Sequence, residues 1–152
     1  MARMMFEQRS VRLPQGELSY FVAGSGRPIV HLHGAGGVRP NLVLTRLSES
    51  LALYLPVLPG FDGMSEFAGV DSMQGLAGVV ADFIDAVIGE AADVLGLSFG
   101  GWLAAWLAVL YPDKVAQLCL ENPAGFLPLD APPLSDDPTV RLREMYVYPE
   151  RR

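Results

Sequence analysis

Ser98 is the best candidate for a nucleophile in this sequence, because of the residues on either side of it. It stands in the run Gly-Leu-Ser-Phe-Gly (residues 96–100), after a short apolar segment and before a long one. A sharp turn from a strand into a helix would expose the hydroxyl in a strained conformation, and only small residues would fit at Gly96 and Gly100. The first helical turn would add free N–H groups and a dipole that favour negative charge. This pattern predicts attack of Ser98 on a carbonyl group.

Two further motifs precede this one in the chain. Residues 32–37 read Leu-His-Gly-Ala-Gly-Gly, and residues 58–65 read Leu-Pro-Gly-Phe-Asp-Gly-Met-Ser. In this order the three motifs resemble those of the α/β-hydrolase superfamily. The first resembles its His-Gly loop, the second its turn after the fourth strand with Asp62 inserted, and the third its nucleophile elbow. The resemblance covers residues 9–123.

The resemblance implies roles for particular backbone groups. The N–H groups of Ala35 and Phe99 would hold the oxyanion of a tetrahedral intermediate, and one well-placed donor is worth about 3–4 kcal/mol. The small residues Gly34 and Gly36 would let the loop approach the substrate closely. The implied reaction is hydrolysis of an ester, a thioester or an activated C–C bond through an acyl-enzyme, with a small-molecule acyl substrate. Transfer of the acyl group to an alcohol or thiol is an alternative that shares the same elbow.

The catalytic set is incomplete in this sequence. The superfamily order is nucleophile, acid, then histidine, whereas His31 and His33 both precede Ser98. The resemblance implies a structural role for His33, and His31 lies in the strand before it. Glu121 is the candidate acid, with a strand-end carboxylate that caps nearby backbone as the alternative. The base would come from residues beyond Arg152 or from another chain.

Bulk properties narrow the function classes. The chain has 152 residues, a net charge of −6 and no basic run, which excludes a nucleic-acid-binding surface. The glycine clusters lack the spacing of nucleotide-binding loops, so we expect no cofactor, and no metal site.

A single cysteine and an N-terminus without a signal peptide predict a cytoplasmic protein. The apolar stretch 94–111 contains Ser98 and several glycines, so we expect no membrane span.

Strands and helices are expected to alternate along the chain. The pattern of apolar residues, glycines and prolines predicts strands in 9–24 (two), 28–33, 54–58, 93–97 and 115–121, and helices in 40–53, from 71–72 onward, and from the elbow to about 111. This order predicts an α/β fold, a mostly parallel sheet with flanking helices, truncated after about the sixth strand. Within it, Cys119, Trp102 and Trp106 are expected to be buried packing residues.

The last part of the chain differs in composition. Residues 1–127 are interpreted as the N-terminal part of the hydrolase core, and the proline-rich acidic residues 128–152 as a linker and the start of a cap. Asp137 and Pro138 are expected to open a short helix. A final strand left as a sheet edge predicts self-association. The alternative to an enzyme is a catalytically silent fragment that binds a ligand or partner.

Overall fold

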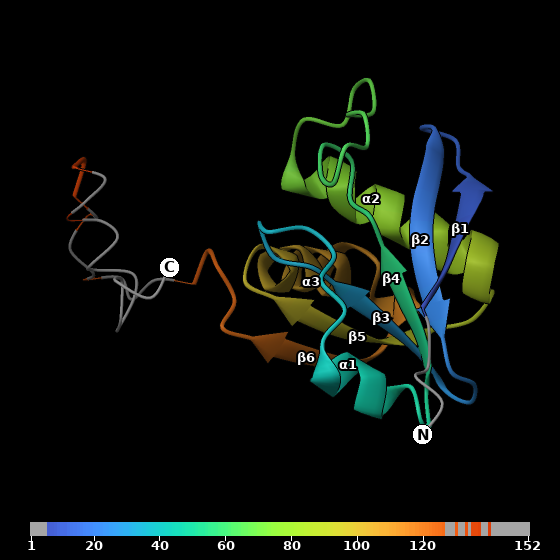
Figure 1. Ribbon diagram of the computed structural model, residues 1–152. Coiled ribbons are helices and arrows are strands. Elements are labelled where there is room, and N and C mark those ends of the chain that lie inside the picture. Colours follow the sequence, from blue (N-terminus) through green and yellow to red (C-terminus); the bar gives the residue numbers. More distant parts are fainter. Residues whose placement is uncertain (1–5, 127–129, 131–132, 134, 138–139, 141–152) are drawn as a thin grey trace.

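The computed structural model describes residues 6–126, 130, 133, 135–137 and 140. Its elements in chain order are β1 (Glu7–Arg12), β2 (Glu17–Ala23), β3 (Pro28–Leu32), α1 (Leu42–Leu47), β4 (Ala52–Pro56), α2 (Met73–Phe83), the π-helical turn η1 (Ile84–Ile88), β5 (Ala92–Leu97), α3 (Phe99–Leu110), the 3-10 turn η2 (Pro112–Lys114) and β6 (Val115–Glu121) (Figure 1).

The strands form one sheet in the order β1-β2-β4-β3-β5-β6. The β1–β2 and β2–β4 pairs are antiparallel, and the pairs among β4, β3, β5 and β6 are parallel. This arrangement confirms the expected α/β fold with a mostly parallel sheet. Because parallel strands end at the same edge of a sheet, the loops that follow β3, β4 and β5 lie close together. The three sequence motifs occupy these loops.

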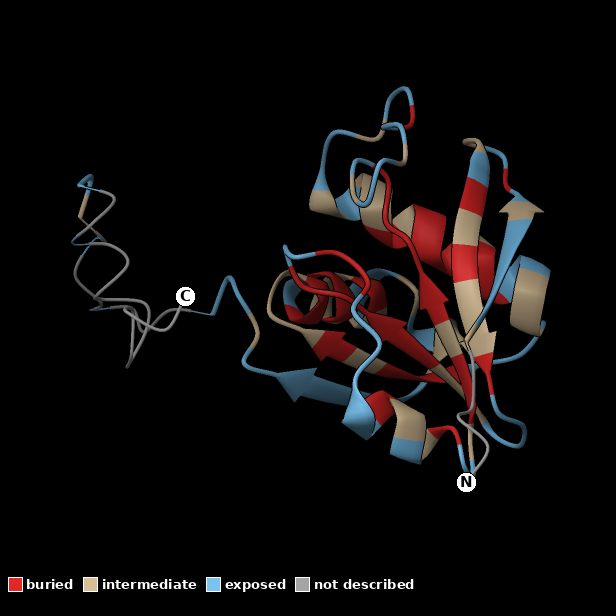
Figure 2. Ribbon diagram, viewed as in Figure 1, coloured by how far each residue is buried: buried red, intermediate tan, exposed pale blue. Residues whose placement is uncertain are grey.

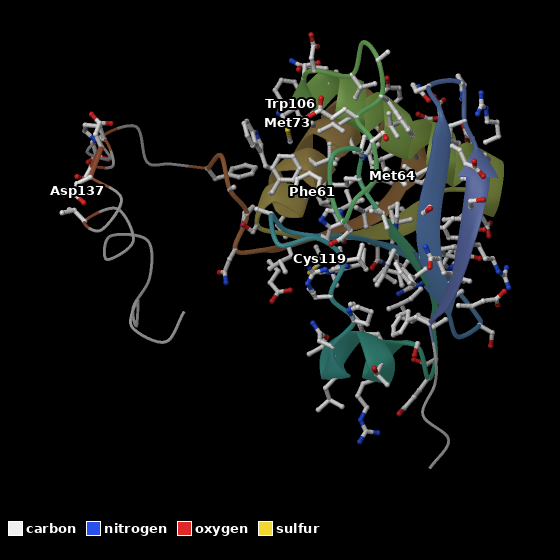
Figure 3. The ribbon with its side chains drawn as sticks, turned by 45° about the horizontal axis from the view of Figure 1, so that its top comes forward. Phe61, Met64, Met73, Trp106, Cys119 and Asp137 are labelled. Carbon is white, nitrogen blue, oxygen red and sulfur yellow. The ribbon has the colours of Figure 1, made fainter. Side chains whose placement is uncertain are left out.

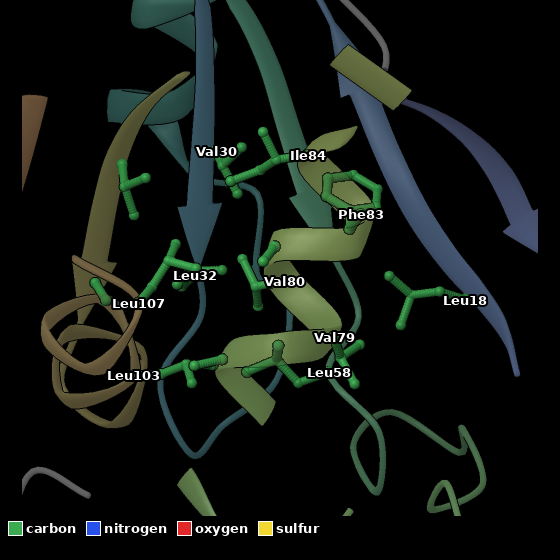
Figure 4. Packing of buried hydrophobic residues seen from close by; sticks show 14 of the residues in the cluster. Leu18, Val30, Leu32, Leu58, Val79, Val80, Phe83, Ile84, Leu103 and Leu107 are labelled. Atoms are coloured by element: carbon green, nitrogen blue, oxygen red, sulfur yellow. The ribbon is translucent and has the colours of Figure 1, made fainter. Parts of the chain in front are cut away.

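The helices cover the two faces of the sheet unequally. Helices α2 and α3 pack side by side on one face, and α1 lies on the other (Figure 1). The larger core cluster lies beneath α2 and α3 and includes Val30, Leu32, Phe83, Leu103 and Leu107, each fully buried (Figure 4). Burial of one such side chain stabilises the fold by about 1.5–3 kcal/mol. Packing of this cluster therefore stabilises the sheet that carries the loops.

The start of α2 follows the sequence closely. Ser72 is the N-cap, and its hydroxyl accepts a hydrogen bond from the Gly75 N–H at 3.2 Å. The helix continues through η1 and ends at Gly89, whose backbone is left-handed with φ 79°.

The helix expected over residues 40–53 is shorter in the structure. Helix α1 spans Leu42–Leu47, with the Asn41 side chain accepting a hydrogen bond from the Leu44 N–H. Strand β4 then begins at Ala52, before the expected start at Tyr54. The reason is that Leu53 and Leu55 alternate into the smaller core cluster while β4 hydrogen-bonds β2 and β3. The alternation of apolar residues in Ala52–Pro56 therefore favours a strand there, although Leu44, Leu47 and Leu51 have helical spacing.

The expected burial of Cys119 was wrong, because Cys119 is exposed. Among the described strands β6 pairs only with β5, and residues 116–121 are exposed (Figure 2). Cys119 is in register with Leu95, so it faces away from α3, on the side where α1 packs over β3, β4 and β5. No described element covers it there.

The two tryptophans of α3 differ in their surroundings. Trp106 is partly buried and packs against the larger core cluster, as expected. Trp102 is 37% exposed, so the expectation that it belongs to the core was wrong. Its ring lies over the backbone of Gly125, where a Cβ atom would come within 2.7 Å of Trp102 Cδ1. A loop rather than another helix lies against this side of α3.

Most of residues 128–152 fall outside the described residues, so their assignment to a linker and cap stays a prediction. The carboxylate of Asp137 accepts a hydrogen bond from the Val140 N–H at 3.3 Å. This bond is the one expected from an N-cap residue. The rest of the helix expected after Asp137 lies outside the described residues.

Candidate active site

Ser98 occupies the turn between β5 and α3. Its backbone has φ 52° and ψ −112°, a conformation that residues with a side chain rarely adopt. The residue is partly exposed and immediately precedes the first turn of α3. The strained strand-to-helix turn expected from the sequence is therefore present.

Two glycines make this turn possible. A Cβ atom at Gly96 would lie 2.5 Å from the carbonyl oxygen of Gly100 and 2.6 Å from Gly101 Cα. A Cβ atom at Gly100 would collide with the Leu32 carbonyl group and lie 2.6 Å from the His33 carbonyl oxygen. Both clashes are with backbone, which cannot move aside as a flexible side chain can. The elbow is thus packed directly against the end of β3.

Backbone hydrogen bonds fix Ser98 on both sides. Its N–H donates to the Glu121 carbonyl oxygen at 3.0 Å, and its own carbonyl oxygen accepts from the Ala124 N–H at 2.9 Å. The loop after β6 therefore holds the elbow in place. Within residues 6–126, the Phe99 N–H at the start of α3 makes no backbone hydrogen bond. This N–H remains free to bind an external acceptor.

The loop after β3 lies beside Ser98. A Cβ atom at Gly34 would be 3.4 Å from Ser98 Cβ, so the two segments are in van der Waals contact. The loop closes on itself through a hydrogen bond of 3.0 Å from the Gly37 N–H to the Gly34 carbonyl oxygen. Ala35 and Gly36, at its tip, are exposed. The backbone at the tip is thus accessible next to the elbow.

His33 supports this loop from below. Its Nε2 accepts a hydrogen bond of 3.1 Å from the Leu58 N–H, so the proton is assigned to Nδ1, which donates to the Gly34 carbonyl oxygen at 2.8 Å. Burial lowers the pKa of the imidazole, although the bond to Gly34 acts in the opposite direction. Both ring nitrogens are occupied, which agrees with the structural role expected for His33.

His31 is also buried, with 6% of its surface exposed, and it is in register with Leu95 of β5. Burial, with a smaller contribution from His33, lowers the pKa of His31 to about 4. Among the described residues its Nδ1 has no hydrogen-bond partner. His31 is therefore a neutral side chain packed in the sheet at neutral pH.

Asp62 joins the loops after β3 and β4, a role that sequence reasoning missed. Its carboxylate accepts hydrogen bonds from the Val38 N–H at 2.6 Å and from Arg39 Nη1 at 2.9 Å. Arg39, followed by the Val38 N–H, lowers the pKa of the Asp62 carboxyl group. The carboxylate also lies against Gly37, where any Cβ atom would collide with it. The signal in the sequence was an acidic residue inserted between Phe61 and Gly63, which no local rule connects to residues 37–39.

Aromatic rings connect the same loops to the elbow. The ring of Phe61, which is labelled in Figure 3, is 5.0 Å from the His33 ring and 5.5 Å from the Phe99 ring, centroid to centroid. A cavity of about 280 Å³ adjoins Phe99 and lies between the loop after β4 and the start of α2. It is lined by Pro59, Glu66, Val70, Asp71, Ser72, Met73, Leu76 and Phe99.

Within the described part of the chain, the Glu121 side chain does not contact a base in the way that a catalytic acid would. Its carbonyl oxygen binds the Ser98 N–H, and its side chain is exposed at the end of β6. Among the described residues no histidine lies in a hydrogen bond with it. The structure brings together Ser98, Phe99, Gly34 and the tip of the loop that carries Ala35, and it adds Asp62 and Phe61.

The family model described as the alpha/beta hydrolase family matches residues 29–151. The chain belongs to this family. Among solved structures, a bacterial membrane phospholipase A superimposes on this chain with a TM-score of 0.75 at 27% identity, over 83% of this chain and 42% of that one.

Curated relatives of this alpha/beta hydrolase chain match over most of its length. It is 35% identical to the dihydrolipoyllysine-residue acetyltransferase component of the acetoin cleaving system of Cupriavidus necator, over 68% of this chain and 28% of that protein. It is 34% identical to 2-hydroxymuconate semialdehyde hydrolase of Pseudomonas sp. strain CF600, over 68% of this chain and 38% of that protein. The chain thus spans well under half the length of these relatives. Among its described residues, no helix is both long and apolar enough to cross a bilayer.

Proposed function

We propose that the elbow is the nucleophile site of a serine hydrolase. Ser98 Oγ attacks the carbonyl carbon of an ester, a thioester or a ketone next to an activated C–C bond, and the leaving group departs with the proton of the Ser98 hydroxyl. Water then hydrolyses the acyl-enzyme, which releases the acid and restores the Ser98 hydroxyl. The observation that carries this proposal is the strained backbone of Ser98 at the start of α3, beside the exposed tip of the loop after β3.

The oxyanion in this proposal is held by the backbone N–H groups of Ala35 and Phe99. Support comes from the free Phe99 N–H and from the contact between Gly34 and Ser98. Donors that are fixed before the reaction stabilise developing charge without reorganising. The His33 and Asp62 hydrogen bonds would keep the Ala35 loop in that fixed position.

Neither His31 nor His33 can provide the general base that this mechanism needs. His33 uses both ring nitrogens in backbone hydrogen bonds, and His31 is buried within β3. Turnover in this proposal therefore needs a base from a longer form of the chain or from a partner chain. Glu121 remains the candidate for the acid, since its backbone adjoins Ser98.

The absence of a histidine after Ser98 favours a second candidate, a catalytically silent domain that keeps the fold and binds a ligand or partner. A fluorophosphonate probe separates the two candidates, because it forms an Oγ–P bond and releases fluoride only at an activated serine. In a longer form of the chain, or with the partner chain that supplies the base, the serine hydrolase predicts one label per chain, located at Ser98 by intact and peptide mass. The silent domain predicts none.

Replacement of the nucleophile tests the assignment directly. Ser98→Ala should abolish labelling and lower ester hydrolysis by any active form to less than about a hundredth of the wild-type value. Ser25→Ala, a matched loss of an exposed hydroxyl at a distant turn, should leave both unchanged. Activity retained in Ser98→Ala would exclude Ser98 as the nucleophile.

A further inference from the structure

The cavity beside Phe99 has an unusual combination of lining residues. One part of its wall is apolar and consists of Pro59, Val70, Met73, Leu76 and Phe99. Another part carries two exposed acidic side chains, Glu66 and Asp71. None of the lining residues is lysine, arginine or histidine. The cavity therefore offers an apolar surface next to negative charge that no lining residue neutralises.

The cavity adjoins Phe99, the residue that follows the proposed nucleophile. Phe99 follows Ser98 directly, and its ring is 5.5 Å from that of Phe61, centroid to centroid. Phe61 and Met73, both labelled in Figure 3, pack against the larger core cluster, and Phe99 does so too. A group in the cavity would thus lie on a supported aromatic wall, against the residue that follows the nucleophile.

The charges near the cavity do not cancel. The N-terminus of α2 would attract an anion, but its N-cap Ser72 already satisfies the Gly75 N–H, and Asp71 stands immediately before the cap. Neither Glu66 nor Asp71 forms an ion pair within residues 6–126. Arg39, in the loop after β3, is already paired with Asp62. The charged residues that line the cavity, among those that the structure describes, are therefore both negative and unpaired.

We propose that this cavity receives an apolar part of the substrate, and that Glu66 and Asp71 select substrates with a cationic end over those with a carboxylate. The inference rests on the proposed function, because it takes the cavity to be the place where substrate lies. Two exposed charges at short range should separate matched cationic and anionic ligands by about tenfold in affinity at low salt.

The test measures binding and does not require turnover. The full 152-residue chain is titrated with 4-phenylbutyltrimethylammonium and with 4-phenylbutyrate, which share the apolar part and differ in charge. Binding is followed by the NMR signals of the Met73 methyl group and the Phe99 amide. We expect both signals to shift, with the cation bound about tenfold more tightly, and the difference to shrink as salt is added.

Isosteric variants attribute the preference to the two carboxylates. The double variant Glu66→Gln with Asp71→Asn should bring the two affinities within about threefold of one another. Glu90→Gln removes one charge at the far end of the α2–η1 helix and should leave the preference unchanged. Equal affinities in the wild type, tighter binding of the carboxylate, shifts confined to other parts of the chain, or no binding at millimolar concentrations would each overturn the inference.

The NMR test of this inference and the fluorophosphonate test of the proposed function can fail independently of one another. Failure of Ser98 to react with the fluorophosphonate in a form that supplies the base would reject the serine hydrolase and leave the NMR result standing. Labelled Ser98 without a cation preference would keep the serine hydrolase and reject the substrate class.

Discussion

At the scale of single residues, Asp62 shows how one side chain can connect two loops of the site. Its own backbone is left-handed, with φ 49°, which aspartate and asparagine tolerate better than other residues with a side chain. Its carboxylate reaches the Val38 N–H, 24 residues earlier in the sequence. The strain at Asp62 and the absence of a side chain at Gly37 both serve the same contact.

Loss of the Asp62 carboxylate should loosen the loop that carries Ala35. We expect Asp62→Ala to lower the free energy of unfolding by about 1–2 kcal/mol, from the lost hydrogen bonds and the strained φ, discounted for partial exposure. Asp62→Asn keeps an acceptor for Val38 and tolerates the backbone, so it should lose less than about 0.5 kcal/mol. Urea unfolding measures both values, and amide exchange at Val38 should accelerate only in Asp62→Ala. Equal stability of Asp62→Ala and the wild type would contradict the role of this contact.

At the scale of elements, the edge formed by β6 and the outer side of α3 stands out. Large apolar side chains are exposed on both, namely Leu118, Leu120, Val109 and Leu110. Among the described strands β6 has a single neighbour, so one row of its backbone groups lacks a strand partner. Such an edge is a template for pairing with another chain. The opposite edge strand, β1, carries the charged residues Glu7, Arg9 and Arg12.

This edge leads us to expect self-association of the chain. Sedimentation velocity over a range of concentrations should show dimers or larger species that dissociate on dilution. Leu118→Lys places a charge on the edge and should shift the population towards monomer. Val43→Lys adds the same charge on the exposed surface of α1 and should have no such effect. A wild-type chain that remains monomeric at all concentrations would contradict the expectation.

At the scale of the whole molecule, stability depends on keeping the two buried histidines uncharged. His31 lies within the sheet with its pKa lowered to about 4, and burial also lowers the pKa of His33. The unfolded chain binds a proton at these sites near pH 6.5, while the folded chain does not. The stabilisation is therefore complete above pH 6.5 and is lost as the pH falls towards 4.

Acid should consequently destabilise the fold over this range. For His31 the difference between the two states corresponds to about 3 kcal/mol when the pH has fallen to 4, at 1.36 kcal/mol per pH unit. Urea unfolding at intervals between pH 7.5 and 4.5 measures the slope. His31→Gln should make it shallower without removing it, because His33 contributes with the same sign. A free energy of unfolding that stays constant from pH 6.5 to 4.5 would exclude this account.

The sequence by itself determined the strands, the main helices and the elbow, because these follow from local sterics and periodicity. Gly96, Ser98 and Gly100 mark a turn that few other residues could make, and alternating apolar residues marked most of the sheet. The same local rules extended α1 too far, since they could not know that β4 would pair with two strands.

Only the tertiary structure decided which distant groups meet. The bonds from Val38 to Asp62 and from Leu58 to His33 join residues 24 and 25 positions apart. No local pattern encodes such contacts, because they depend on which strands become neighbours. The cavity beside Phe99 and the exposure of Cys119 arise in the same way. Each reflects which surfaces the packed helices cover and which they leave open to solvent.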